Sequence, residues 1–278
     1  MARDFTSETS MNQLTHYPLL IFAIAFGSLW LAALFGRYFL RRQRKPDKEL
    51  RDDFGVILAA TLTLLGLIIG FSFSMAINRY DLRKNYEEAE ANAIGTEYIR
   101  FDLLPAADAD KLRPLLRNYL DQRIAFYLAQ DEPELQRINA RTAGLQADLW
   151  SAIRTPAAML PNPIVALAVV GMNDVLNSQG YTQAGFWNRI PVAAWSLIGA
   201  IAIGCNLLVG YGSRSVSAGF KLLPILPLLV SIALMFIADI DAPRHGIIRV
   251  NPQNLMSLAG SLDPNRPATA PAKPSEMN

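Results

Sequence analysis

Residues 70–98 read GFSFSMAINRYDLRKNYEEAEANAIGTEY. This stretch continues an apolar segment that begins at Phe54, and from Arg79 onward charged residues follow one another closely. It contains no proline, and Gly95 is the only glycine after its first residue. Because little in it would break a helix, the sequence predicts one continuous helix that crosses a bilayer and carries charges out of it.

The charges beyond Ile77 have helical spacing. Arg83 and Glu87 are four residues apart, as are Lys84 and Glu88, so opposite charges share a helix face and offset one another. We therefore interpret the charged half as a solvated stalk that runs on into a soluble bundle, with its arginines near the lipid headgroups.

Four windows of the chain lack charge over about the 20 residues that a helix needs to cross a bilayer. They are residues 18–35 with an extension to Leu40 past Arg37, 54–77, 191–211 and 222–238. The first is too long for a signal-peptide core and lacks a small-residue cleavage site, so we expect it to be retained. With 51% apolar residues, the sequence predicts an all-α, polytopic membrane protein with four transmembrane helices.

The predicted organisation has five parts. They are a polar leader (1–17), transmembrane helices 1 and 2 (18–77), an extramembrane helical bundle (78–189), transmembrane helices 3 and 4 (190–240), and a polar C-terminal segment (241–278) that we expect to be disordered from about residue 260.

The bundle is expected to be helical because apolar residues recur at helical spacing and no sustained alternation favours strands. The helix from the membrane is expected to end at Leu104-Pro105. A second helix begins near the Asp-Ala-Asp at 108–110, Asp131-Glu132-Pro133 opens a third, and residues 164–179 form a fourth.

The sequence lacks the patterns of an enzyme. His16 and His245 have no metal-ligand spacing, and no phosphate-binding loop or nucleophile motif is present. The net charge of +2 is small, and the basic residues are not interleaved with stacking aromatics, which argues against nucleic acid. Cys205 is the only cysteine, so no disulfide forms within the chain. We predict no catalysis, cofactor, metal or nucleic-acid partner.

Charged residues gather where two of the apolar windows end. Asp239 and Asp241 follow the fourth window and would in principle suit acid/base chemistry. We favour a polar cap at the membrane surface instead. This membrane-exit polar cluster consists of Arg79, Asp81, Asp239, Asp241 and Arg244.

The second apolar window has features of a pore helix. Side chains that lie about one turn apart would line a common face, hydroxyl and amide groups can coordinate an anion, and an apolar ring can gate by dewetting. The competing interpretation is packing, because hydroxyls in membrane helices commonly bond to carbonyls of their own helix, and Gly66 and Gly70 permit close helix contact. The candidate pore-lining residues are Thr63, Leu67, Phe71, Ser72, Met75 and Asn78.

Three blocks of the sequence carry a resemblance to a known family. They are residues 70–105, then MNDVLNSQGYTQAGFWNRIP at 172–191, and ADIDAPRHGIIRVNPQNLMSL at 238–258. Together and in this order they resemble the bestrophin-like domain family of bacterial membrane proteins, which is distantly similar to bestrophins, the pentameric anion channels. The resemblance implies a helical, oligomeric membrane protein in the bacterial inner membrane.

Similarity to bestrophins themselves centres on Phe71 and on Arg79-Tyr80. In bestrophins this helix lines the pore, and apolar side chains four residues apart form a narrow neck. The resemblance assigns those places to Thr63, Leu67 and Phe71. The sequence departs from the bestrophin pattern at Asp81, where a second aromatic is expected, and at Thr63, where a bulky apolar residue is expected.

Two indications disagree about which side of the membrane holds the bundle. Seven basic residues between Arg37 and Arg51 favour a cytoplasmic first linker, which puts the bundle in the periplasm. The resemblance to bestrophins implies a cytoplasmic bundle.

The resemblance implies a homo-oligomeric, bestrophin-like channel or channel-derived protein in the lipid bilayer, with the second apolar window facing the axis and chloride or another small anion as its ligand. The alternative is a non-conducting sensor or scaffold whose bundle binds a ligand or a partner protein.

Overall fold

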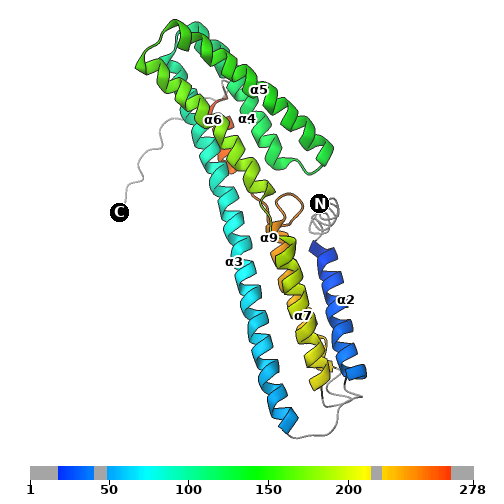
Figure 1. Cartoon of the computed structure of the whole chain (residues 1–278). Coiled ribbons are helices and arrows are strands. Elements are labelled where there is room, and N and C mark those ends of the chain that lie inside the picture. The colour runs from blue at the N-terminus through cyan, green and yellow to red at the C-terminus, as the bar shows by residue number, and fades with distance from the viewer. Residues whose placement is uncertain (1–17, 41–48, 214–220, 264–278) are drawn as a thin grey trace, which may run out of the picture. The chain divides into compact units, whose positions relative to one another are not determined.

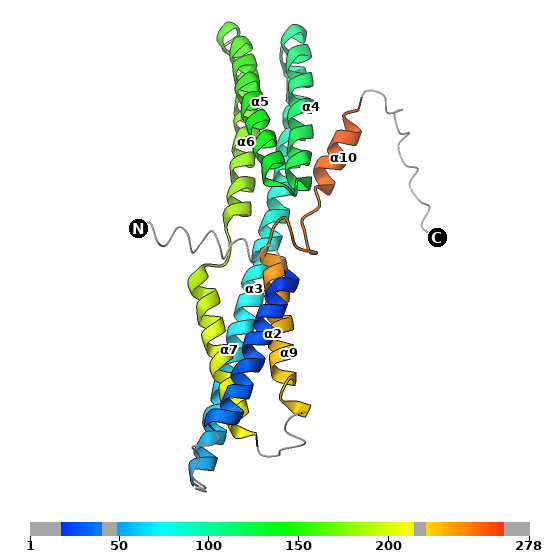
Figure 2. The same ribbon diagram turned by 90° about the vertical axis from the view of Figure 1, so that its right-hand side faces the viewer.

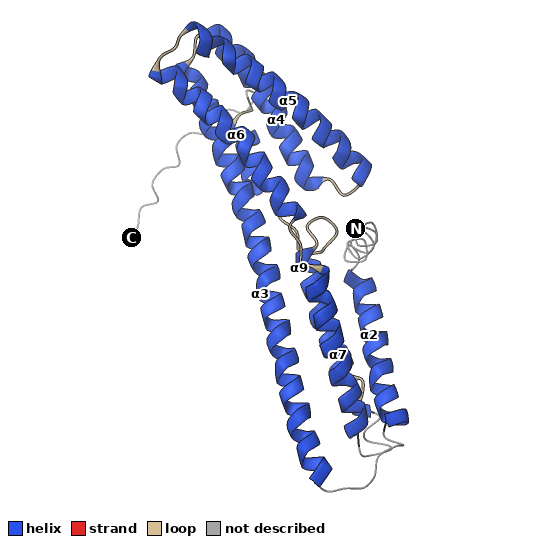
Figure 3. Ribbon diagram, viewed as in Figure 1, coloured by secondary structure: helices blue, strands red, loops and turns tan. Residues whose placement is uncertain are grey.

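The computed structural model describes residues 18–40, 49–213 and 221–263 (Figure 1). Over these residues the chain is helical and contains no strand, as predicted (Figure 3). The polar leader, most of the basic first linker, the loop at 214–220 and the C-terminal segment from residue 264 lie outside the described residues, and so do the predictions that fall on them. The described residues divide into two compact units.

The first unit contains residues 18–81 and 188–249 of the described chain. Its helices are α2, Pro18–Phe35, which continues as the π-helical segment η1, Gly36–Leu40; the first part of α3, Glu49–Arg100; α7, Val192–Gly212; and α9, Ile225–Asp241. Their interior is apolar, and the buried residues that form it are Leu29, Leu65, Ile198, Ala202, Cys205, Val230 and Leu234.

Two glycines bring α2 and η1 close to α7. A Cβ atom on Gly210 would lie 2.0 Å from the backbone oxygen of Ala33, and one on Gly36 would lie 2.1 Å from the backbone oxygen of Leu207. Backbone atoms therefore occupy the space that a side chain would need. Close helix contact through small residues is a common way for helices to associate in membranes.

Three described stretches are long and apolar enough to cross a membrane, namely Pro18–Phe39, Asp53–Leu103 and Pro163–Gly212. The predicted fourth window corresponds to α9, which has 17 residues and begins only after Pro224. Before α9, residues 221–222 are helical and residues 223–224 form a turn, while Pro227 lies within the helix. A fourth crossing stays a prediction.

The second unit contains residues 82–187 and those from Val250 onward. Its helices are the second part of α3, the short 3₁₀ segment η3 (Phe101–Leu103), α4 (Ala106–Leu128), α5 (Glu132–Met159), α6 (Pro163–Trp187) and α10 (Gln253–Ser261). Leu112, Leu116 and Leu149 are among its fully buried residues. The helix α10 packs against α4 (Figure 2).

The predicted helix boundaries are correct at some ends and wrong at others. The first bundle helix ends just before Leu104-Pro105, and α5 begins after Asp131, both as expected. The helix α4 begins at Ala106, directly after Pro105, so Asp108 lies inside its first turn and does not cap it. A proline that precedes the first helical residue fixes the start of the helix earlier than the acidic cluster suggested.

Helix α3 is continuous over 52 residues, as the sequence predicted. The interpretation of its charged half as a solvated stalk is wrong for four charged residues that are at most 2% exposed. We call Arg83, Glu87, Glu90 and Glu97 the buried polar face of α3.

Candidate functional site

The candidate pore-lining residues do not all share one face of α3. Leu67 and Phe71 are 52% and 63% exposed, and Thr63, Met75 and Asn78 are exposed as well. We call these five residues the outer face of α3. Ser72 is 4% exposed and donates a hydrogen bond to the carbonyl of Ile68 at 2.8 Å.

The outer face is not covered by any other part of the chain that the structure describes. Only 6% of the most apolar window of α3 is buried, against 28% for the stretch that contains α2. A Cβ atom on Gly66 or Gly70 would meet nothing within 4 Å. The GxxxG spacing therefore serves no helix contact within the described part of the chain, and this side of α3 is available to lipid or to another subunit.

Asp241 is the centre of the membrane-exit polar cluster. Its two carboxylate oxygens accept the backbone N–H of Ile190 at 3.2 and 3.1 Å, and Arg79 Nη1 lies 3.5 Å from Oδ1. Asp241 is 1% exposed, so these partners replace the water that a carboxylate needs. The side chain ties the start of α7 to the end of α9 inside the first unit.

Asp239 organises the loop that follows α9. Its Oδ1 accepts the backbone N–H of Ile247 at 2.7 Å, and its Oδ2 accepts that of Ile248 at 3.0 Å. Arg244 lies in the same loop, where its carbonyl accepts a bond from Arg249 Nη1 at 3.4 Å. Asp81 is exposed on α3. The structure thus brings Arg79 to Asp241, while Asp239 and Arg244 serve the loop.

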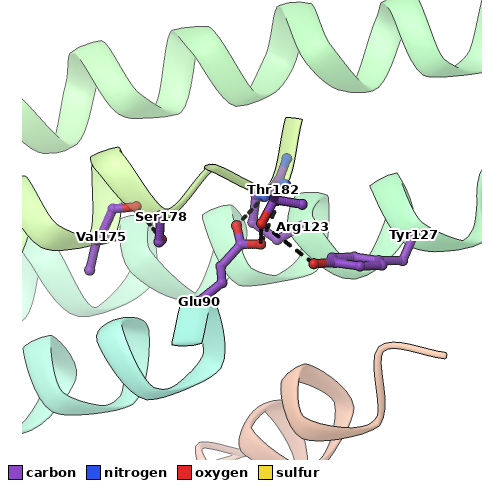
Figure 4. Close-up of polar contacts among 6 residues, drawn as sticks. All are labelled: Glu90, Arg123, Tyr127, Val175, Ser178 and Thr182. Carbon is purple, nitrogen blue, oxygen red and sulfur yellow. Dashed lines mark hydrogen bonds and ion pairs between the residues drawn. The ribbon is translucent and has the colours of Figure 1, made fainter. Parts of the chain in front are cut away.

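A second polar site, inside the bundle, was not predicted. Glu90 of α3 is fully buried and forms an ion pair with Arg123 of α4, which is also fully buried (Figure 4). Arg123 Nε donates to Glu90 Oε1, and Nη2 donates to Oε2 at 3.4 Å. The guanidinium also lies 4.5 Å from the ring centroid of Phe126. Burial by itself lowers the pKa of Arg123, but the Glu90 carboxylate raises it overall.

Helix α6 completes this site. The Thr182 hydroxyl donates to Glu90 Oε2 at 2.9 Å. Because its only hydrogen is used there, the Tyr127 hydroxyl is the donor in the 3.5 Å contact with Thr182 (Figure 4). Burial, and then the Glu90 charge, raise the pKa of Tyr127 above its ordinary value, so the phenol stays neutral. Glu90 therefore connects α3, α4 and α6 at one buried point.

Glu87 fixes the C-terminal helix to the bundle. Its Oε1 accepts the backbone N–H of Leu255 at 2.9 Å, and its Oε2 accepts Asn254 Nδ2 at 2.6 Å. Both donors lie in the first turn of α10, where a carboxylate satisfies free N–H groups and interacts favourably with the helix dipole. Leu255 is fully buried beside this contact.

Glu87→Ala should release α10 from the bundle. The substitution removes two hydrogen bonds to a charged acceptor, each worth about 1.5–3 kcal/mol, and a short helix has little stability of its own. We expect faster amide hydrogen exchange across residues 253–261, measured by mass spectrometry. Glu88→Ala, at an exposed position next to it, is the control. Unchanged exchange in α10 would show that its apolar contacts alone hold it.

Comparison with known proteins identifies the fold. Two solved structures of a bacterial bestrophin homologue from Klebsiella pneumoniae are 13% identical to this chain, with TM-scores of 0.59 and 0.57. Both cover 88% of this chain, and 96% and 99% of their own. A further structure, described as a membrane protein, covers 86% of this chain and 98% of its own at a TM-score of 0.57 and 13% identity. No curated protein matches the chain.

The family assignment comes from the sequence itself. The model of the bestrophin-like domain matches residues 19–255, which is most of the chain. That range includes α2 from its second residue, every helix up to the end of α9, the outer face of α3, the exit cluster and the buried Glu90 site. This protein therefore belongs to the bestrophin-like domain family of membrane proteins.

Proposed function

We propose that this protein is a homo-oligomeric anion channel of the bacterial inner membrane in which the outer face of α3 lines the pore. The observation that carries the proposal is the exposure of this face, which bears Leu67 and Phe71 together with the polar Thr63 and Asn78. Polar side chains are unfavourable against lipid tails and are expected to face protein or a water-filled cavity. An oligomer with α3 at its axis provides such an environment.

The pairing of apolar and polar groups on this face suits a small anion. Phe71 and Leu67 from several subunits would form rings that exclude water when narrow and admit it when wide. Asn78, near the end of the apolar segment, offers amide donors, as an anion such as chloride requires. The Thr63 hydroxyl already donates to the carbonyl of Ala59 at 2.9 Å, so it presents its oxygen and methyl group to the proposed pore.

The remaining topology belongs to the same proposal. We infer that α2, the apolar part of α3, α7 and α9 cross the bilayer, which makes the protein multi-pass with four spans. The side of the membrane that holds the bundle stays open between the positive-charge rule and the likeness to bestrophins.

Phe71→Ala should alter ion flux while leaving the oligomer assembled. We expect a several-fold change in chloride flux, or altered chloride over potassium selectivity, because the substitution removes the bulky side chain from the proposed apolar ring at this position. The measurement is flux from liposomes that contain purified protein, with chloride and potassium gradients tested separately. Phe73→Ala is the matched control, because Phe73 is an exposed phenylalanine two residues further along the helix and so points to a different side of it.

Two results would contradict the proposal. Equal changes in the flux of both variants would show that Phe71 does not line the pore. The absence of flux from a folded oligomer in every form would favour the non-conducting sensor or scaffold, and attention would turn to the bundle as a binding module.

A further inference from the structure

One member of the buried polar face of α3 lacks the partners that the others have. Glu87 bonds to α10, Glu90 to α4 and α6, and Arg83 Nε donates to the carbonyl of Gly185 at 3.1 Å. Glu97 is fully buried, yet neither of its carboxylate oxygens has a hydrogen-bond partner among the described residues. A buried carboxylate without hydrogen bonds is strongly unfavourable in its charged form.

The space that Glu97 occupies is created by a glycine of α6. A Cβ atom on Gly171 would lie 2.0 Å from Glu97 Oε2 and 2.1 Å from Arg100 Nη1. The carboxyl group therefore lies directly against the backbone of α6, at a place where no larger residue fits without displacing it. Any movement of Glu97 toward water changes the contact between α3 and α6.

Few charges act on Glu97. On its own helix, Arg100 Nη1 is 3.9 Å from Oε2, beyond hydrogen-bond distance, and its side chain is 31% exposed. On α6, Asp174 is a charge of the same sign. The helix α10, which packs on α3 at Gly95, carries no titratable side chain, and Asp102 of η3 is paired with Arg113 of α4.

We propose that Glu97 is a proton-sensitive switch of the bundle: it is a neutral carboxylic acid while α3 and α6 are closely packed, and its ionisation loosens that contact. Burial raises the pKa of Glu97 to about 8, with Arg100 lowering it and Asp174 raising it. Glu97 is twenty residues further along the sequence of α3 than Ile77, where the apolar segment ends. An ionised Glu97, repelled by Asp174, is stabilised only by water or by a closer approach of Arg100.

The sign of the pH effect follows from linkage. The pKa of Glu97 is about 8 in the folded protein and 4.5 in its ordinary state. Between these values the unfolded chain has lost the proton while the folded chain still binds it, so stability falls as the pH rises. In this window the equilibrium constant for folding falls by up to about tenfold per pH unit. The fall levels off above the pKa that Glu97 has in the folded protein.

The first test detects the protonated carboxyl group directly. In infrared spectra of the full chain in detergent, we expect a carboxylic-acid band at neutral pH that disappears with a midpoint near pH 8. The band should be absent in Glu97→Gln and unchanged in Glu88→Gln, an exposed position of the same helix. Asp174→Asn should lower the midpoint, because it removes the charge that repels the ionised Glu97. This variant retains Glu97, so it tests the switch even if Glu97→Gln does not fold.

The second test reports the contact. At each pH we compare the rate of amide hydrogen exchange around Gly171 in the wild type with the rate in Glu97→Gln. The ratio of the wild-type rate to the variant rate should rise as the pH increases from about 6 to about 10. A band that persists in Glu97→Gln, a midpoint in the ordinary range of carboxylic acids, or a pH-independent exchange difference would each overturn the switch. Neither test measures ion flux, so the inference holds or fails separately from the channel proposal.

Discussion

Arg123→Ala should lower the free energy of unfolding of the protein by about 3–5 kcal/mol, because it leaves Glu90 as a charge without its ion-pair partner in a fully buried site. Thr182 still donates to Glu90, but one neutral hydroxyl does not replace a guanidinium. The helices α3, α4 and α6 meet at this carboxylate, so the loss should be distributed over the bundle. The measurement is denaturant-induced unfolding in mild detergent, followed by the helical circular dichroism signal.

Two comparisons make this prediction specific. Arg141→Ala removes an exposed arginine from α5 and should change stability by no more than about 0.5 kcal/mol. A double variant with methionine in place of both Glu90 and Arg123 removes both buried charges and should be more stable than Arg123→Ala alone. Equal losses in Arg123→Ala and Arg141→Ala would mean that the buried pair contributes nothing.

Gly210→Ala should force α2 and α7 apart. The added methyl group would lie 2.0 Å from a backbone oxygen of Ala33, and backbone cannot move aside as a flexible side chain can. Overpacking of this kind costs about 1–3 kcal/mol, occasionally more, and Gly36→Ala should have the same effect from the opposite helix. The measurement is the midpoint of thermal unfolding in detergent, together with the fraction of protein that stays monodisperse.

Gly199→Ala is the matched control for that experiment. It lies in the same helix, but nothing lies within 4 Å of the position of its Cβ. Alanine is a better helix former than glycine by about 1 kcal/mol, so this variant should be unchanged or slightly more stable. A similar loss in Gly199→Ala and Gly210→Ala would show that the close approach to Ala33 is unimportant.

Three stretches long and apolar enough to cross a membrane were predictable, because the length of an uncharged run decides whether a helix can cross a bilayer. The continuity of α3 was predictable for a similar reason, since its sequence contains no proline. The helix α10 was missed because its nine residues have no strong local signal. The helix is held by its bond to Glu87, which is distant in the sequence, and by the burial of Leu255.

The buried charges could not be read from local sequence. Arg83 and Glu87 have the four-residue spacing of a solvated helix surface, but Glu87 bonds to α10 and Glu90 to an arginine 33 residues further along the chain. A charged side chain on a helix can be buried only where distant parts of the chain provide its ion-pair or hydrogen-bond partners. The same holds for Ser72. It is adjacent to Phe71 in the sequence, but other parts of the chain bury the face of α3 that carries Ser72 and leave the face that carries Phe71 exposed.

The single cysteine has a practical consequence. Cys205 is 1% exposed and its thiol contacts the carbonyl of Thr61 at 3.3 Å, so thiol reagents should react with it slowly in the folded protein. The native cysteine should therefore contribute little signal in a cysteine-labelling experiment. A cysteine introduced at an exposed bundle position such as Glu88 would be modified by a membrane-impermeant maleimide from one side of the cell membrane only, which would assign the orientation that charge and family likeness leave in dispute.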